Sequence, residues 1–392
     1  MEVRYGLILL LTLALSSCSR DLDLAHRYDN TESSKPFVDE NQQPEENPGT
    51  DSDMQFTEVG GILLSDRVKV NVPSSIPRAG YILDGKITVG KFGGSDKFTT
   101  FWSADYSMMQ TDCATPWLED NIAGLNKNMS IIGKGVTPVI DGFTDGGMWL
   151  IGVHELASGK LVGYFHAESH YNGIASQYKS IGVAYSNDGG KTWDKGTKII
   201  SGSDPKPEVG EGNGKSYGLG DGCVVWNEAR KQWICYYSGF CPDPHDFVIT
   251  MAASSDPEGK PGTWKKWDGQ DFTTEGCDQS TGLGAINVKI AGLAFRGGNP
   301  SVAWNTELNK WIMVYHTWGR NIVMSLSDDG INWSEETTII GYVQEQGGSM
   351  YPNIISEDGD LTCGKEFRVY YSADMDGAGK RDLIYRVIRL KN

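Results

Sequence analysis

The sequence has no sustained helical periodicity, no CxxC pair and no basic stripe, and each absence narrows what the protein can be. Without a 3.6-residue period in its apolar residues, helix should be scarce. Without closely spaced cysteine pairs, a structural zinc site is not expected. The 51 acidic residues outnumber the 35 Lys and Arg residues, and the net charge of −16 repels phosphate backbones. Nucleic acid is therefore not an expected partner.

The sequence also lacks, after its first 17 residues, any apolar run long enough to span a membrane. The start itself has Arg4, an apolar stretch over 5–15, and small residues before Cys18. This order resembles a bacterial lipoprotein signal, in which the residue after the cleavage site is a lipid-modified Cys. An ordinary secretion signal with a chance cysteine is the alternative. We expect a signal peptide over 1–17 and a protein held outside the cytoplasm, at the outer membrane, by the lipid alone.

The segment after Cys18 has almost nothing to bury. Its stretch NQQPEENPGTDSD is polar and acidic, which predicts a flexible tether over 18–55 and one folded domain over 56–392. A domain of that size can bury a substantial core. The six cysteines of the domain form disulfides or stay as buried thiols, and Cys235 and Cys241 are close enough to clip one hairpin.

Short apolar runs separated by Gly, Asn, Asp and Pro recur along the domain. One unit reads GCVVWNEARKQWICYYSGF followed by FVITMAASSDPEGKPGTWKKW, and another reads NPSVAWNTELNKWIMVYHTW followed by NIVMSLSDDGINW. Five such units predict an all-β fold, a five-bladed β-propeller of four-stranded antiparallel blades. An N-terminal strand within Gly61–Val72 or Gly80–Val89 would complete the last blade. One or two β-sandwiches are the alternative, but they would not repeat a Trp at the same place.

Two polar turns mark the repeat, SNDGGKTW at 186–193 and SDDGINW at 327–333. The first resembles the Asp-box of sialidases and related propellers, because Ser186, Asp188, Gly190, Thr192 and Trp193 match its defining positions. The second copy is one residue shorter and has Asn in place of Thr. In such a turn Asp and Ser brace the backbone and Trp packs between sheets. We therefore expect scaffold between third and fourth strands, not a catalytic site.

Polar residues at the starts of innermost strands and at the ends of second strands should meet at one mouth of a propeller channel, where small ligands usually bind. The densest group is GYFHAESHY, in which His166, Glu168 and His170 alternate and so share one strand face. We interpret it as a sugar-binding and acid/base cluster; a polar plug or a metal site is the alternative. The other residues expected to bind substrate are Tyr236, Asn299, His316, Trp318, Arg320 and Tyr351.

Three carboxylates are the predicted catalytic groups: Asp112, Glu168 and Asp221. Glycosidic cleavage needs one acid to protonate the leaving oxygen and a second carboxylate to activate water or attack the anomeric carbon. Glu168 is the expected acid, because apolar neighbours and a second carboxylate would favour its protonated form. Asp112 or Asp221 would be the base or nucleophile. The alternative is that each Asp only caps a turn.

The five units, the Asp-box-like turns and acidic residues from units one, two and three together resemble the five-bladed propeller glycoside hydrolases around family 43 and its furanosidase-rich relatives. In that family three acidic residues lie on the inner strands of the first three blades, whereas here only Asp221 does so. The resemblance implies a secreted or surface glycoside hydrolase that uses carboxylate acid/base catalysis on a polysaccharide or oligosaccharide. No cofactor should be required and no metal is expected at the site; a structural Ca²⁺ is left open.

Two other functions stay open. An exo-sialidase-like hydrolase would use six blades, an arginine triad and a Tyr/Glu pair, but the nine arginines after the tether form no recognisable triad. A non-catalytic glycan-binding surface lipoprotein would keep Trp318, Tyr236 and His170 as a platform and would not need the carboxylates.

Overall fold

The computed structural model describes most of the chain after the tether: residues 54–73, 85–104, 107–122, 147–170, 177–194, 196–207, 216–241, 246–294, 296–317, 321–341, 349–374 and 381–391. They belong to the second of the two units into which the chain divides, Thr50–Asn392. Except for one short helix, α2 (Leu118–Asn121), the described elements are strands, and no described helix is long and apolar enough to cross a membrane. Cys18 and the predicted signal peptide lie outside the described residues.

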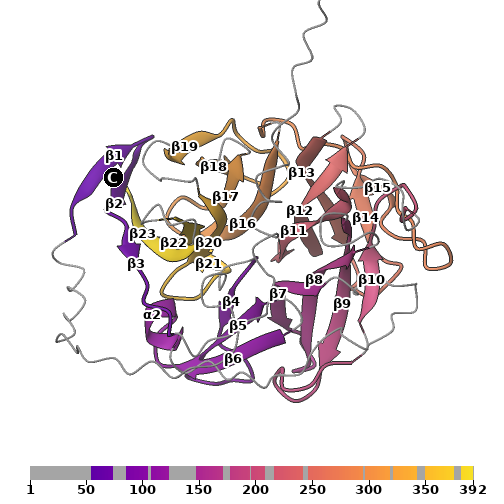
Figure 1. Ribbon diagram of the computed structural model, residues 1–392, viewed down its shortest axis with the longest axis horizontal. Coiled ribbons are helices and arrows are strands. Elements are labelled where there is room, and N and C mark those ends of the chain that lie inside the picture. Colours follow the sequence, from indigo (N-terminus) through magenta and orange to yellow (C-terminus); the bar gives the residue numbers. More distant parts are fainter. Residues whose placement is uncertain are drawn as a thin grey trace, which may run out of the picture. The chain divides into compact units, whose positions relative to one another are not determined.

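The described strands form four sheets, of six, nine, five and three strands, and the nine-stranded sheet contains two antiparallel meanders (Figure 1). For reference we number the two meanders and the other three sheets in chain order as blades one to five. Blade one contains β4 (Thr88–Gly90), β5 (Phe98–Ala104) and β6 (Ser107–Cys113). Blade two contains β7 (Gly147–Glu155), β8 (Leu161–His170), β9 (Gln177–Ser186) and β10 (Thr197–Ile200). Blade three contains β11 (Ser216–Asn227), β12 (Gln232–Cys241), β13 (Asp246–Ser254), β14 (Lys265–Trp267) and β15 (Phe272–Glu275).

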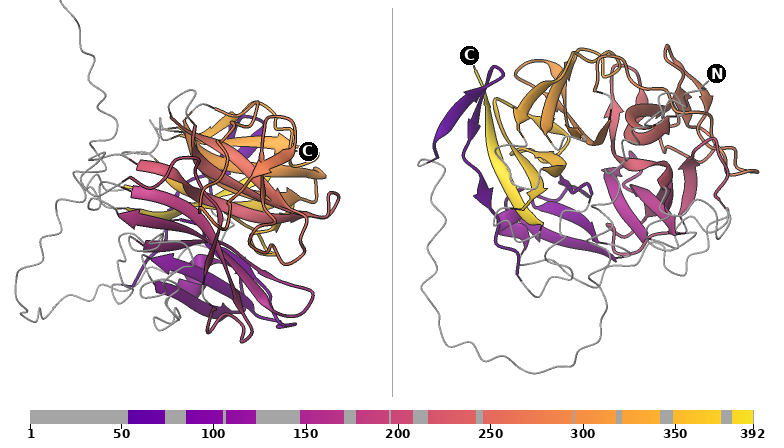
Figure 2. Two further views of the ribbon diagram at one scale, coloured as in Figure 1. Left: turned by 90° about the vertical axis from the view of Figure 1, so that its right-hand side faces the viewer. Right: turned by 45° about the horizontal axis from the view of Figure 1, so that its top comes forward.

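Blade four contains β16 (Gly297–Asn305), β17 (Lys310–Thr317), β18 (Ile322–Ser327) and β19 (Thr337–Ile340). Blade five contains β20 (Met350–Ile355), β22 (Glu366–Ala373) and β23 (Asp382–Leu390), and β21 (Thr362–Cys363), which lies between β20 and β22 in the chain, pairs with β16 instead. Blades two and three are also joined to each other, because the start of β11 pairs in parallel with β9. Figure 1 and the right-hand view of Figure 2 show the blades around a common centre.

Strands from the start of the domain complete blade five. β2 (Ile62–Ser65) pairs antiparallel with β23, and β1 (Phe56–Val59) continues the sheet outside β2. β3 (Val68–Lys69) also pairs with β23. The predicted closure by a strand within Gly61–Val72 is therefore confirmed. Of the other segment considered, Gly80–Val89, the structure describes residues 85–89, and Thr88 and Val89 belong to β4 of blade one.

The hydrophobic core is divided into five clusters, and each lies between two neighbouring blades. Between blades three and four, for example, Tyr236 and Met251 belong to one cluster with Met313 and Tyr315. Strands such as β12 are thus buried on both faces, which explains why they read as continuous apolar runs. Because the last cluster joins blade five back to blade one, the packing forms a closed ring. The prediction of an all-β propeller is confirmed.

The turn at 186–193 joins β9 to β10 and is braced by its own side chains. Ser186 Oγ accepts the N–H of Gly190 at 2.9 Å, and Asp188 Oδ1 accepts the N–H of Thr192 at 2.8 Å. The hydrogen bond from the Thr192 hydroxyl lowers the pKa of Asp188 to about 2. In the turn at 327–333, Asn332 Nδ2 replaces that hydroxyl and donates to Asp329 Oδ2 at 2.7 Å. The polar side chains of both turns therefore stabilise the turns themselves, which is a structural role.

The cysteines do not cross-link the described domain. Cys235 and Cys241 lie on the same strand, β12, so the idea that they clip a hairpin is wrong. Six residues of extended strand separate them by about 20 Å, whereas a disulfide needs Cα atoms within about 7 Å. None of the six cysteines among the described residues takes part in a disulfide, and five of them are buried.

Candidate functional site

Three inner strands share an irregularity where they enter the centre of the ring: β11, β16 and β20 each carry a bulge near their start. The bulge residues Asp221, Asn299 and Tyr351 have φ angles of 47°, 51° and 54°. This left-handed conformation is uncommon for residues other than Gly, above all for a bulky one. Such strain persists only where the surrounding structure enforces it, and it clusters at active sites and ligand clamps. Three strained residues at the corresponding position of three inner strands therefore mark a candidate site.

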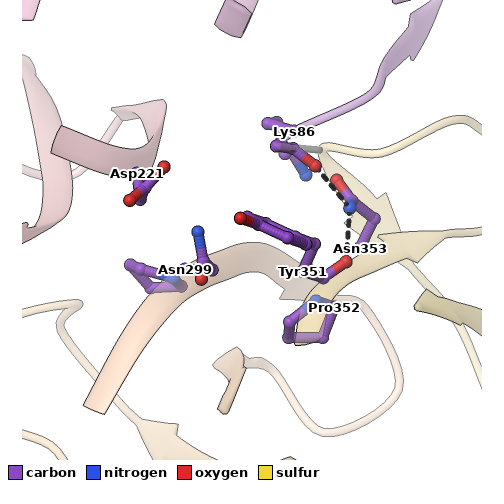
Figure 3. A pocket seen from close by; sticks show the side chains of 9 residues that line it. Lys86, Asp221, Asn299, Tyr351, Pro352 and Asn353 are labelled. Atoms are coloured by element: carbon purple, nitrogen blue, oxygen red, sulfur yellow. Dashed lines mark hydrogen bonds between the residues drawn. The ribbon is translucent and has the colours of Figure 1, made fainter. Parts of the chain in front are cut away.

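The three bulge residues line a pocket at the centre of the ring (Figure 3). Their side chains point toward one another across it, from three different blades (Figure 3). The space between the protein atoms is about 200 Å³, part of it open to solvent. The lining is completed by Gly85, Lys86, Gly222, Pro300, Pro352 and Asn353. The pocket thus combines a carboxylate, two amides, a phenol and an ammonium group.

Lys86 is buried at this pocket and has two polar partners. Its Nζ lies 2.9 Å from Ser301 Oγ and 3.4 Å from Asp360 Oδ2. Burial raises the pKa of Asp360, and the Lys86 ammonium opposes that rise. Asn353 holds the same segment, because its Oδ1 accepts the N–H of Ile87 at 2.9 Å. Polar contacts therefore tie blade one to blades four and five at the pocket.

A second polar cluster borders the pocket beside Asp221. Glu168 and His166 share one face of β8, and Glu168 Oε1 lies 3.1 Å from His166 Nε2. Lys179 on β9 lies 3.3 Å from the same Glu168 oxygen and 3.8 Å from Asp221 Oδ2. These two carboxylate oxygens are therefore no more than about 7 Å apart.

Hydrogen bonds define the protonation of His166. Its Nδ1 accepts the backbone N–H of Asp221 at 2.9 Å. A ring nitrogen that accepts a hydrogen bond carries no proton, so Nε2 carries the proton and donates to Glu168. Glu168 thus faces an N–H group and the Lys179 ammonium. Asp221 is the more open carboxylate, with 25% of its side chain exposed against 9% for Glu168.

The structure brings together five of the residues singled out in the sequence. Asp221, Asn299 and Tyr351 line the pocket, and Glu168 and His166 lie beside it on one strand face, as their alternation predicts. His316 is 2% exposed on β17, directly opposite Gly298 and thus next to the bulge of β16. The side chain of His170, together with Trp318 and Arg320, lies outside the described residues.

Asp112 does not reach the pocket. It is an exposed residue of β6 whose Oδ1 accepts the Thr99 hydroxyl at 2.7 Å. β4 lies inside β5, the strand that contains Thr99, and β6 pairs with β5 on its outer side. Asp112 therefore falls on the third strand of blade one, away from the centre. With three residues, β4 is too short to show a pattern of its own.

Tyr236 is a core residue and does not contact the pocket. It is fully buried, its hydroxyl donates to Gly330 O at 2.5 Å, and its ring packs edge-on against Trp333. The expected sugar platform at this position is therefore wrong, because both faces of β12 are covered by neighbouring blades.

Sequence reasoning missed two cations of the site, Lys86 and Lys179. Lys86 directly precedes the apolar run ITV, and Lys179 lies two residues before the apolar run IGVAY. A lysine beside such a run is the signal that was available, because a buried ammonium needs a partner. Among the described residues, no group of three or more His, Cys, Asp or Glu side chains is arranged to hold a metal ion.

Fold and pocket together define a β-propeller protein with a polar central pocket. No known protein family matches the sequence, and no curated protein matches it. Among the solved structures to which the chain is similar are the following three. An α-L-arabinofuranosidase of Fusarium graminearum in complex with arabinobiose is 12% identical, covers 83% of this chain and 97% of its own, and has a TM-score of 0.47.

The second structure is an endo-arabinase from Bacteroides thetaiotaomicron, 11% identical, with 83% of this chain and 98% of that chain covered and a TM-score of 0.46. The third is an N-acetylgalactosamine deacetylase from F. plautii in complex with blood group B trisaccharide, 12% identical, with 81% and 93% covered and a TM-score of 0.42. At these identities the similarity concerns the fold.

Proposed function

We propose that the chain is a glycoside hydrolase whose sugar site is the central pocket. The observation that carries this proposal is the convergence of Asp221, Asn299 and Tyr351 from three blades, with Glu168 beside Asp221. Amide, phenol and carboxylate groups pair with sugar hydroxyls, and an aromatic ring offers the apolar face on which a sugar ring packs. A polysaccharide or oligosaccharide is the proposed substrate, met outside the cytoplasm.

The surroundings of the two carboxylates suggest their roles. Glu168, with Lys179 and the His166 Nε2–H beside it, suits the base that activates water or the nucleophile that attacks the anomeric carbon. Asp221 is the more open group and would give its proton to the leaving glycosidic oxygen as the C–O bond breaks. This assignment reverses the roles expected from sequence, because the cation beside Glu168 does not favour a protonated acid.

One observation favours a second function, a non-catalytic glycan-binding module. Lys179 lies 3.3 Å from one carboxylate and 3.8 Å from the other, so each already has a cationic partner. With both groups ionised, the pocket would bind sugar hydroxyls without an acid for the leaving oxygen.

The deciding experiment incubates the purified mature protein with arabinan, xylan, galactan, fucan and sialylated glycans, and measures both released sugars and binding. We expect release from at least one of them. Asp221→Asn and Glu168→Gln should each lower the rate by about 100-fold or more while binding is retained. The matched control is Glu307→Gln, which removes an exposed carboxylate in the hairpin between β16 and β17.

Near-parental turnover of D221N would contradict the assignment of Asp221. Binding without release from any of the five glycans would establish the binding module instead. Release of sialic acid alone would support the sialidase alternative, although no arginine is among the described residues that line the pocket.

A further inference from the structure

Asp221 is held from both sides by side chains of second strands. His166 Nδ1 accepts its backbone N–H at 2.9 Å, and Ser238 Oγ donates to its carbonyl oxygen at 3.2 Å. A bulge residue is left out of the hydrogen-bond ladder, so its backbone groups need other partners. The two side chains supply them.

The same contact recurs one blade further around the ring. Ser238 Oγ also lies 3.1 Å from the backbone N of Asn299, whose N–H it accepts. A second-strand side chain of blade two thus caps the bulge of blade three, and one of blade three caps the bulge of blade four. Ser238 therefore contacts two of the three strained residues of the pocket.

The imidazole ring of His166 is held in one position by its surroundings. Its side chain is 2% exposed, and Trp149 packs edge-on against it with ring centroids 5.3 Å apart. A Cβ atom at position 220 would lie 1.7 Å from His166 Nδ1, so only Gly220 admits the ring. A buried ring with both nitrogens engaged neither reaches a substrate nor exchanges protons with one.

We propose that His166 is a positioning residue that couples the two carboxylates of the site. Its Nδ1 fixes the left-handed backbone that turns Asp221 into the pocket, its Nε2–H orients Glu168, and Ser238 extends the clamp to Asn299. The consequence for turnover rests on the proposed function, whereas the clamp is a property of the free protein.

Two variants separate the two contacts of His166. In His166→Asn the amide lies near the place of Nδ1 but does not reach Glu168; in His166→Gln the amide reaches Glu168 but leaves the Asp221 N–H without an acceptor. Amide hydrogen exchange of the full mature protein, without substrate, reads the clamp directly. We expect exchange at the Asp221 N–H to be about 10-fold faster or more in H166Q and near-parental in H166N.

A kinetic readout distinguishes positioning from a general loss of structure. On whichever glycan of the panel the parent hydrolyses, kcat should fall in both variants by about 10- to 100-fold, with KM changed less than about threefold. Ser325→Ala is the control. Ser325 is a buried serine on β18, the third strand of blade four, and its hydroxyl donates to Ser334 O. The variant should leave both exchange at Asp221 and kcat near parental.

Parental exchange at Asp221 in folded H166Q would overturn the clamp. If neither His166 variant folds, Ser238→Ala decides, because it should speed exchange at Asn299, and unchanged exchange there overturns the proposal equally. A parent that hydrolyses no glycan, with the expected exchange in H166Q, would refute the proposed function and leave the clamp standing.

Discussion

Two buried histidines of adjacent strands show how much a single residue depends on its partners. His166 has a partner on each ring nitrogen, whereas His154 Nε2 has none among the described residues. His154 lies on β7 against the rings of Tyr164 and Trp233. Burial lowers the pKa of His154 to about 4, so the ring is neutral at pH 7. One histidine organises the candidate site, and the other fills the core between blades two and three.

The buried ring of His154 predicts loss of stability in acid. Between pH 6.5 and about 4 the unfolded chain binds a proton at this residue and the folded chain does not. The free energy of unfolding should therefore fall as the pH is lowered through this window, by about 3 kcal/mol from this group. Urea unfolding of the parent and of His154→Asn at pH 7.5, 5.5 and 4.5 measures it. Equal pH dependence in the two proteins would show that His154 contributes nothing.

At the scale of elements, helix α2 joins blade one to blade five through Arg368. The guanidinium lies 3.9 Å from the ring centroid of Trp117 and 4.5 Å from that of Tyr385. It pairs with Glu119, which also accepts the Tyr370 hydroxyl at 2.7 Å. The helix has only four residues and packs where the first and last blades meet. Its stability therefore comes from these contacts and not from its own hydrogen bonds.

Replacing Glu119 should weaken this junction. Glu119→Ala leaves the Arg368 side chain, 8% exposed, without its carboxylate, and we expect a loss of about 1–3 kcal/mol. The matched control is Glu366→Ala on β22, the strand that also carries Arg368. It breaks an exposed ion pair with Arg389, 37% exposed, and should cost less than about 1 kcal/mol. Denaturant unfolding of both variants gives the two losses. If they are equal, the junction does not depend on Glu119.

At the scale of the whole molecule, the fold is a ring in which every core cluster needs both neighbouring blades. β2 from the start of the domain and β23 from its end lie in the same blade, so the ring is closed by strands distant in sequence. This arrangement places the first strands of blades three, four and five, and the segment just before β4, around one pocket. The tether and anchor proposed for the residues before the domain would hold that pocket outside the cytoplasm.

The proposed lipid anchor gives a prediction for the intact cell. Cys18→Ala removes the residue that would carry the lipid, and an acyl chain supplies most of the binding energy of such an anchor. We expect the variant to leave the membrane fraction and the parent to stay in it, as measured by fractionation and blotting. Replacing Cys113, a cysteine of the domain, with Ala is the control. A C18A variant that stays with the membrane would end the lipoprotein hypothesis.

Local patterns in the sequence were sufficient for the fold and for part of the site. The strand and turn repeat, with Trp193 and Trp333 after their polar turns, predicted the propeller because each turn is built from neighbouring residues. The alternation of His166 and Glu168 predicted a shared face for the same reason, since strand geometry has a period of two. The sequence pattern also predicted that Asp221, Asn299 and Tyr351 lie near the starts of inner strands.

What the sequence alone determined, therefore, was the all-β repeat, its scaffold turns and the residues that begin the inner strands. Only the tertiary structure decided which strand of blade one is innermost, and with it that Lys86 and not Asp112 belongs to the pocket. It also decided that Lys179 contacts both carboxylates, through the parallel pairing of β9 with β11. The physical reason is that these contacts join blades far apart in sequence, and their register is set by packing around the closed ring, which no local pattern encodes.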